Sequence, residues 1–226
     1  MSLLRAYQRA IILLDWVLTR IYIRKMEFFG REHVPEGPLI LASNHLNNAD
    51  PPMIALAVTR LPTFMAKREM LRWPIIGPGF RIFGAFPVRR SGADLAAFRV
   101  ASEVVQSGKM LVMFPEGTRS RTGALTKGHP GTALIALRTD APILPVAITG
   151  TEDITWPWIF LKPLGVRRIT VTIGEPFHLP KAERIDGEAA AEGTEIIMRR
   201  IAALLPPEYR GVYAEVEQPA EQSARA

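Results

Sequence analysis

The chain has 226 residues, 48% of them hydrophobic and 22% charged, so it is long enough for one α/β core and too short for two comfortable domains. The 28 Lys and Arg outnumber the 22 Asp and Glu, and the net charge of +6 favours a negatively charged partner such as nucleic acid, anionic lipid or a phosphorylated substrate. The absence of Cys excludes disulfides, thiolate metal sites and a Cys nucleophile.

Residues 1–30 predict an N-terminal amphipathic helical segment that associates with a membrane. Its apolar stretch, residues 10–18, is interrupted by Asp15 and followed by Arg20, so it fits neither a signal peptide nor a transmembrane helix of about 20 apolar residues. Apolar and aromatic side chains flanked by cations are instead typical of a helix that lies in the membrane interface. The alternative is a helix packed on the core with solvated charges.

Beyond this segment, short apolar runs alternate with stretches of helical periodicity. Strands are predicted at residues 39–42, 63–66, 83–88, 110–114, 143–148 and 169–173. Helices are predicted at residues 51–60, from 94 to a C-cap at Gly108, at 131–138 and at 188–205. The alternation predicts a single α/β domain, residues 31–212, with a mixed, mostly parallel sheet covered by helices on both faces. Residues 213–226, rich in Glu, Gln, Ala and Pro, predict a flexible tail.

A candidate catalytic pair, His45 and Asp50, follows the first of these strands. An imidazole can take a proton from an attacking hydroxyl, and a carboxylate beside it can fix the tautomer and stabilise the imidazolium. The four intervening residues are enough for the chain to turn back and bring the two side chains together. Asp50 followed by Pro51 and Pro52 is also typical of a helix start with Asp as the N-cap, so the pair alone leaves both interpretations open.

Three cations, Lys67, Arg90 and Arg119, each follow a predicted strand. Sites in α/β sheets gather beyond the carboxyl ends of the strands, so these cations could converge on one phosphate. Arg offers a planar donor fork for phosphate oxygens, and Lys offers a mobile point charge. Gly117 permits a tight turn and a close approach of ligand to backbone. One such cation is usually a solvated surface charge, whereas three at successive strand ends favour a shared ligand.

Four motifs occur in a fixed order between residues 37 and 150. They are N-H-x-x-x-x-D at 44–50, Gly84 through Arg90, F-P-E-G-T-R-S at 114–120 and Leu144-Pro145-Val146. In this order they resemble the glycerophospholipid acyltransferase family, which includes the lysophosphatidic acid acyltransferases. H-x-x-x-x-D is common by itself, but followed about seventy residues later by an unchanged F-P-E-G-T-R-S it is a specific signature.

The resemblance implies transfer of a fatty acyl group from a thioester donor, acyl-CoA or acyl-carrier protein, to the free hydroxyl of a lysophospholipid. The resemblance does not choose among lysophosphatidic acid, other lysophospholipids and less usual lipid alcohols. The acceptor that we expect is 1-acyl-sn-glycerol-3-phosphate, which gives phosphatidic acid. His45 would be the general base, and Asp50 would orient it. Two departures from the family pattern concern the acceptor: Asn47 stands where many members have Ser, and Arg89 where many have Asp.

The resemblance also implies the binding residues. Lys67, Arg90 and Arg119 would hold the acceptor phosphate. Glu116 and Gly117 would line the glycerol site.

No metal and no cofactor beyond the acyl donor are expected, because none of the four His is paired at helical ligand spacing. The sequence has no recognisable nucleic-acid motif, so membrane lipids are the expected partners. The expected location is peripheral or monotopic on the cytoplasmic face of a membrane. Two alternatives stay open: a member of the same family that acts on another lipid alcohol or a glycosylated acceptor, and a non-catalytic protein that binds anionic lipid.

Overall fold

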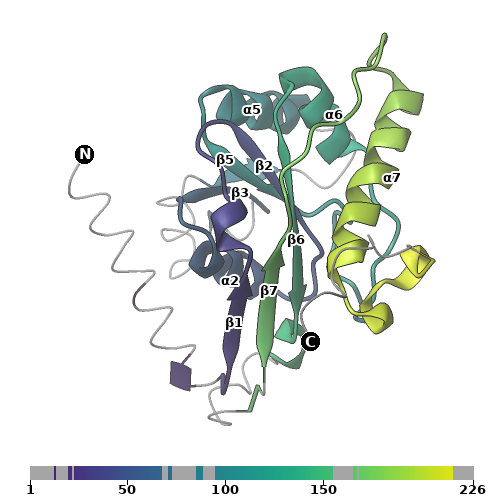
Figure 1. Ribbon diagram of the computed structural model, residues 1–226. Coiled ribbons are helices and arrows are strands. Elements are labelled where there is room, and N and C mark those ends of the chain that lie inside the picture. Colours follow the sequence, from purple (N-terminus) through teal and green to yellow (C-terminus); the bar gives the residue numbers. More distant parts are fainter. Residues whose placement is uncertain are drawn as a thin grey trace.

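Seven strands form one mixed sheet in the part of the chain that the computed structural model describes, residues 13, 20, 21, 23–67, 71, 72, 85–88, 95–154, 165, 166 and 168–215 (Figure 1). In chain order they are β1 (Met26–Phe29), β2 (Leu39–Ser43), β3 (Pro62–Lys67), β4 (Phe86–Val88), β5 (Met110–Met113), β6 (Ile143–Thr149) and β7 (Ile169–Ile173). Their order across the sheet is β1-β7-β6-β2-β5-β3-β4, and every neighbouring pair is parallel except β6 and β7. The prediction of a mixed, mostly parallel sheet is confirmed.

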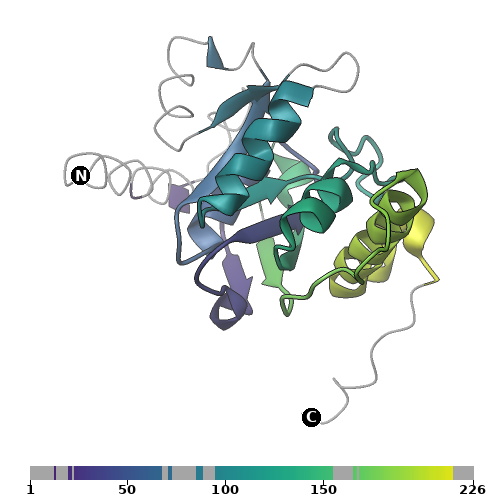
Figure 2. The same cartoon turned by 90° about the horizontal axis from the view of Figure 1, so that it is seen from above.

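Helices pack on both faces of this sheet. α2 (Asp50–Ala57) covers one face, and α5 (Leu95–Gln106), α6 (Gly131–Thr139) and α7 (Gly187–Leu204) cover the other. The two cartoon views agree that α6 and α7 lie side by side (Figures 1 and 2). The prediction of helices on both faces is therefore confirmed.

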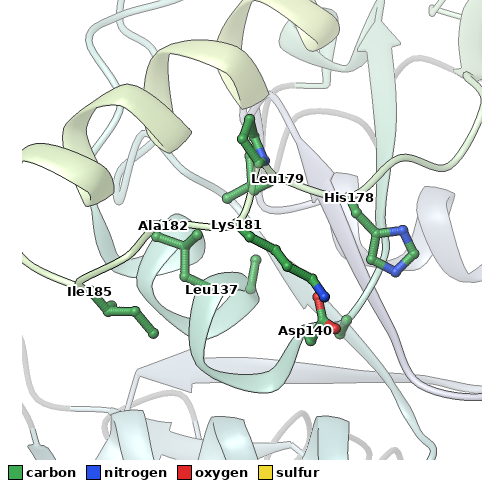
Figure 3. A pocket seen from close by; sticks show the side chains of 10 residues that line it. Leu137, Asp140, His178, Leu179, Lys181, Ala182 and Ile185 are labelled. Atoms are coloured by element: carbon green, nitrogen blue, oxygen red, sulfur yellow. The ribbon is translucent and has the colours of Figure 1, made fainter.

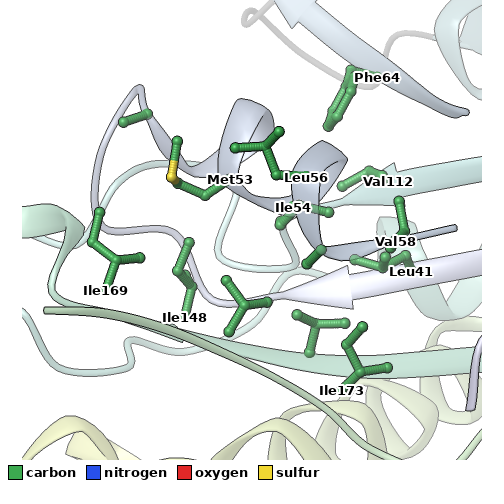
Figure 4. Packing of buried hydrophobic residues seen from close by; sticks show 14 of the residues in the cluster. Leu41, Met53, Ile54, Leu56, Val58, Phe64, Val112, Ile148, Ile169 and Ile173 are labelled. Atoms are coloured by element: carbon green, nitrogen blue, oxygen red, sulfur yellow. The ribbon is translucent and has the colours of Figure 1, made fainter. Parts of the chain in front are cut away.

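The central strand β2 contributes side chains to two hydrophobic cores. Leu39 and Leu41 belong to the core under α2, and Leu41 lies beside Val58, the residue that follows this helix (Figure 4). Ile40 and Ala42 enter the core under α5, α6 and α7. Because both faces of β2 are covered, all five of its residues are fully buried, as expected for a central parallel strand. The loop that follows β2 therefore begins at the middle of the sheet, at the edge formed by the carboxyl ends of its parallel strands.

The strand β1 differs from the sequence-based prediction. It lies inside the segment 1–30 that was expected to be helical, but Met26–Phe29 pairs in parallel with β7, with Met26 opposite Ile169. Earlier in the segment Leu13, Arg20 and Ile21 are helical, and its other residues before Ile23 lie outside the described part. The helical prediction is wrong for residues 26–29, because pairing with the edge of β7 overrides the local apolar pattern.

Other boundaries fall close to their predicted positions. Gly108, the predicted C-cap, has φ 75° just after α5. Tyr213, predicted as the first residue of a flexible tail, is only 6% exposed and packs in the second core, so the folded chain continues through it. Residues 216–226 of the predicted tail lie outside the described part, as do residues 83 and 84 of the predicted strand 83–88. Among the described residues, no helix combines the length and the apolar character needed to cross a bilayer.

Candidate active site

Asn44 follows β2 directly, and its side-chain amide makes the hydrogen bonds to β6 that the backbone of a further strand residue would make. Its amide donates to the Ile148 carbonyl at 2.8 Å, and its oxygen accepts from the Ile148 N–H at 2.8 Å. This exchange extends the pairing of β2 with β6 by one step. It also fixes the start of the loop that carries His45, whose ring stacks on Phe114 with centroids 4.1 Å apart.

The carboxylate of Asp50 organises this loop. Its Oδ2 lies 2.7 Å from Nδ1 of His45 and also accepts from the backbone N–H groups of Leu46 at 2.6 Å and Asn47 at 2.8 Å. Its Oδ1 accepts from the hydroxyl of Thr151 at 2.5 Å. Asp50 is completely buried, so these four donors replace the water that a carboxylate would otherwise need.

The N-cap interpretation of Asp50 is wrong. The N-cap of α2 is Ala49, no side chain caps the helix, and Asp50 is the first helical residue. Its carboxylate turns back toward the preceding loop instead of forward to the first turn. The carboxylate therefore serves the loop and His45.

The contact with Asp50 determines which nitrogen of His45 is available. A carboxylate accepts hydrogen bonds, so in the neutral ring Nδ1 carries the proton and Nε2 keeps the lone pair. Nε2 has no hydrogen-bond partner among the described residues, and the side chain of His45 is 17% exposed. His45 can therefore accept a proton from a molecule that reaches Nε2.

The F-P-E-G-T-R-S loop holds the main chain of His45 from both sides. Glu116 Oε1 accepts from the His45 N–H at 3.0 Å, and the Ser120 N–H donates to the His45 carbonyl at 2.7 Å. The second oxygen of Glu116 accepts from the N–H and the hydroxyl of Thr126 at 2.9 and 2.8 Å. Glu116 is only 1% exposed, so its carboxylate makes these hydrogen bonds in the interior of the protein.

Gly117 makes the turn in this loop possible. Its N–H donates to the Phe114 carbonyl at 2.9 Å, and its φ of 66° lies in the left-handed region that favours glycine. A Cβ at this position would lie 3.0 Å from Cδ2 of His129. Gly117 is exposed, and its left-handed φ provides the tight turn that the sequence predicts.

The described part of the chain includes the three residues predicted to bind phosphate to different extents. Arg119 is exposed beside this turn and makes no ion pair with a described residue. Lys67 is the last residue of β3, and because β2, β5 and β3 run parallel as neighbours, its backbone lies at the same sheet edge as the loops after β2 and β5. The side chain of Lys67 and the whole of Arg90 lie outside the described residues.

Two supporting threonines and the role of Asn47 have no distinct sequence signal. Thr151 begins the short helix η2 (Thr151–Asp153) directly after β6, and Thr126 follows the F-P-E-G-T-R-S motif. Asn47, a departure from the family pattern, donates through its amide to the Ile154 carbonyl at 2.8 Å. The loop around His45 is thus tied to η2 through both Asp50 and Asn47.

A separate hollow lies at the opposite edge of the sheet (Figure 3). Asp140, His178 and Lys181 contribute its polar side chains, near the start of β6. It contains none of the predicted site residues. Within the described part of the chain, no three His, Asp or Glu are grouped so that they could hold a metal ion.

Known proteins similar to this chain are acyltransferases. The sequence model of the Acyltransferase family matches residues 25–149, more than half of the chain. A 1-acyl-sn-glycerol-3-phosphate acyltransferase of Bacillus subtilis is 28% identical over 189 residues, covering 79% of this chain and 87% of that protein. The chloroplastic 1-acyl-sn-glycerol-3-phosphate acyltransferase BAT2 of Brassica napus is 28% identical over 179 residues, 77% of this chain. The chain spans about half the length of the plant relative, 52%.

A solved structure has the same fold. The crystal structure of the 1-acyl-sn-glycerophosphate acyltransferase PlsC from Thermotoga maritima matches with a TM-score of 0.71 at 24% identity, covering 88% of this chain and 79% of that one. The region matched by the family model contains His45, Asp50 and the whole F-P-E-G-T-R-S loop. The chain therefore belongs to the acyltransferase family.

Proposed function

We propose that this protein transfers a fatty acyl group from acyl-CoA or acyl-carrier protein to the free hydroxyl of 1-acyl-sn-glycerol-3-phosphate, producing phosphatidic acid. The observation that carries the proposal is the pair formed by His45 and Asp50, in which a fully buried carboxylate holds Nδ1 and leaves Nε2 open. The names of the relatives from Bacillus subtilis and Brassica napus support this choice of acceptor.

His45 acts as the general base in a single displacement. Nε2 takes the proton of the acceptor hydroxyl while the hydroxyl oxygen attacks the thioester carbonyl carbon. The tetrahedral intermediate collapses, the C–S bond breaks, and the leaving thiolate takes the proton from the imidazolium. Asp50 stabilises this imidazolium, and a base positioned in this way contributes about 10²- to 10⁴-fold in rate.

The acceptor glycerol lies against the turn formed by Glu116 and Gly117. Gly117 is exposed in this turn, whereas the buried carboxylate of Glu116 holds His45 and Thr126. Arg119 leads from this turn toward solvent, and Lys67 ends the neighbouring strand at the same edge. These two cations and Arg90 bind the acceptor phosphate.

Arg119→Ala is expected to raise the KM for the lysophosphatidic acid acceptor by about tenfold, because one charge-assisted hydrogen bond of about 1.5 kcal/mol is lost. The KM for the acyl donor should change much less. Steady-state kinetics with each substrate varied in turn measure both constants. Arg99→Ala removes an equally charged, exposed side chain of α5 and serves as the control, with no change expected. Equal increases in both KM values in Arg119→Ala would contradict the assignment.

The proposed reaction is tested with a panel of acceptors, each offered with acyl-CoA and with acyl-carrier protein, and products identified by mass spectrometry. We expect phosphatidic acid from lysophosphatidic acid with the highest kcat/KM in the panel. A preference for another lipid alcohol or a glycosylated acceptor would overturn the choice of acceptor. Binding to anionic vesicles without any ester product would support a non-catalytic lipid-binding protein instead.

We also propose that the protein works at the cytoplasmic surface of a membrane. Acceptor and product of the proposed reaction are lipids, so the site has to reach a bilayer. Leu13 and Ile21 are exposed apolar side chains in the segment that the sequence identifies as amphipathic, which supports an interfacial role for it.

A further inference from the structure

The chain beyond α7 is bound to the loop that follows the F-P-E-G-T-R-S motif. Two short helices, η4 (Pro207–Tyr209) and η5 (Gly211–Tyr213), follow α7 and lie outside the region matched by the family model. Leu125 makes two backbone hydrogen bonds with them: its N–H donates to the Tyr209 carbonyl at 2.8 Å, and its carbonyl accepts from the Val212 N–H at 3.3 Å. This C-terminal turn therefore pairs with Leu125 in the manner of a short strand.

Two further contacts close the same interface. The Gly128 N–H donates to the hydroxyl of Tyr213 at 3.3 Å. Gly211 has φ 52°, and a Cβ there would lie 2.1 Å from the Leu125 carbonyl oxygen, so the close approach requires glycine. Thr126, the partner of Glu116, lies between Leu125 and Gly128 and is held by this interface.

The side chain of Tyr209 reaches the other support of the catalytic pair. Its hydroxyl donates to Oε1 of Glu152 in η2, the residue next to Thr151. Oε2 of Glu152 is buried without a partner in the described part of the chain, so Tyr209 provides the one hydrogen bond that holds this carboxylate there. Burial raises the pKa of Tyr209, and the bond to Glu152 and the charge of Glu152 raise this pKa further. The hydroxyl therefore stays protonated and remains a donor at physiological pH.

We propose that Tyr209 is a positioning residue for the catalytic pair. Its carbonyl holds Leu125, next to Thr126, and Thr126 holds the Glu116 carboxylate that binds the main chain of His45. Its hydroxyl holds Glu152, next to Thr151, and Thr151 binds Asp50. One residue from outside the matched family region thus connects the supports of both catalytic side chains. The kinetic consequence rests on the proposed acyl transfer.

Tyr209→Phe is expected to lower kcat by about tenfold and to leave both KM values within about twofold, because it loosens the pair without touching a bound substrate. Glu152→Ala removes the same hydrogen bond from the other side and is expected to lower kcat by a similar factor. The two substitutions should not add, since each removes the same interaction. Two independent variants keep the test decisive if one of them folds poorly.

Two comparisons distinguish a loss of kcat caused by mispositioning of the catalytic pair from one caused by general destabilisation of the fold. Ile201→Val removes one buried methylene from α7, in the same hydrophobic core as Tyr209 but without any of the hydrogen bonds of Tyr209, and should leave kcat unchanged below the melting temperature. In a Thr151→Val background the effect of Tyr209→Phe on kcat should shrink, because the bond through which it acts on Asp50 is already absent. A kcat unchanged in Tyr209→Phe, an additive effect with Thr151→Val, or an equal loss in Ile201→Val would each overturn the proposal.

Hydrogen–deuterium exchange tests the positioning role independently of activity. We expect faster exchange in residues 45–50 and 151–153 of Tyr209→Phe than of the unsubstituted protein, because both segments lose the support of the Tyr209 hydroxyl. Exchange in residues 114–128 should change less, since Phe keeps the backbone carbonyl that accepts from Leu125. Unchanged exchange in both residues 45–50 and residues 151–153 would overturn the positioning role. If the unsubstituted protein acylates no acceptor in the panel, the proposed function fails, while the exchange result still decides whether Tyr209 holds the two segments.

Discussion

His45→Ala is expected to lower acyl transfer to lysophosphatidic acid by about 10²- to 10⁴-fold, the range that a positioned general base contributes. The loss should appear in kcat, because the base acts on the acceptor hydroxyl after both substrates have bound. The protein should remain folded, since the ring is partly exposed and the Asp50 carboxylate keeps its three other hydrogen bonds. Initial rates at saturating substrate measure the effect, and circular dichroism checks the fold.

The matched control is His178→Ala. His178 is exposed and lines the hollow at the opposite edge of the sheet, so its removal deletes the same side chain without touching the site (Figure 3). Acyl transfer by this variant should equal that of the unsubstituted protein. A folded His45→Ala protein with undiminished acyl transfer would show that another group removes the proton.

The strands could be predicted from the sequence where their own residues carry a pattern of apolar and polar side chains. The strand 169–173 alternates between buried and partly buried residues, and its predicted bounds match β7. β1 could not be found in this way, because three apolar residues and Glu27 next to a longer apolar segment carry no period of their own. Its strand character comes from pairing with β7, more than 130 residues later in the chain.

The contact between His45 and Asp50 could be predicted because spacing and sheet geometry act together. A loop after a central strand and a second loop after its parallel neighbour have to meet, which brings His45 against the F-P-E-G-T-R-S loop. The direction of the Asp50 carboxylate could not be predicted. Asp-Pro-Pro begins a helix equally well whether the carboxylate caps that helix or turns back to the preceding loop.

The supporting roles of the Thr151 and Thr126 hydroxyls could not be predicted from the sequence either. A single hydroxyl that supplies one hydrogen bond to a buried carboxylate leaves no pattern, because threonine after a strand or in a loop is ordinary. Only the structure shows that each buried carboxylate near His45 has its own threonine donor. The same holds for Tyr209, whose two contacts join segments far apart in the sequence.

Asp50→Asn is expected to lower kcat by about 10²- to 10⁴-fold, because an amide can neither stabilise the imidazolium nor accept all four hydrogen bonds. One oxygen now accepts bonds from three donors, on His45, Leu46 and Asn47. The least damaging arrangement keeps the amide oxygen there and turns the NH₂ group toward Thr151, whose hydroxyl can rotate to accept. His45 then keeps a neutral partner but loses the charge that stabilises its protonated form.

The same substitution should lower the free energy of unfolding by about 1.5–3 kcal/mol, the usual value of a hydrogen bond to a charged group, and thermal unfolding measures it. Asp140→Asn is the matched control. Asp140 is exposed, lines the distant hollow and has φ 49°, a conformation that Asn also tolerates, so neither activity nor stability should change. If Asp50→Asn kept more than about a tenth of the activity while its stability fell, the carboxylate would be a structural support of the loop and not the group that activates His45.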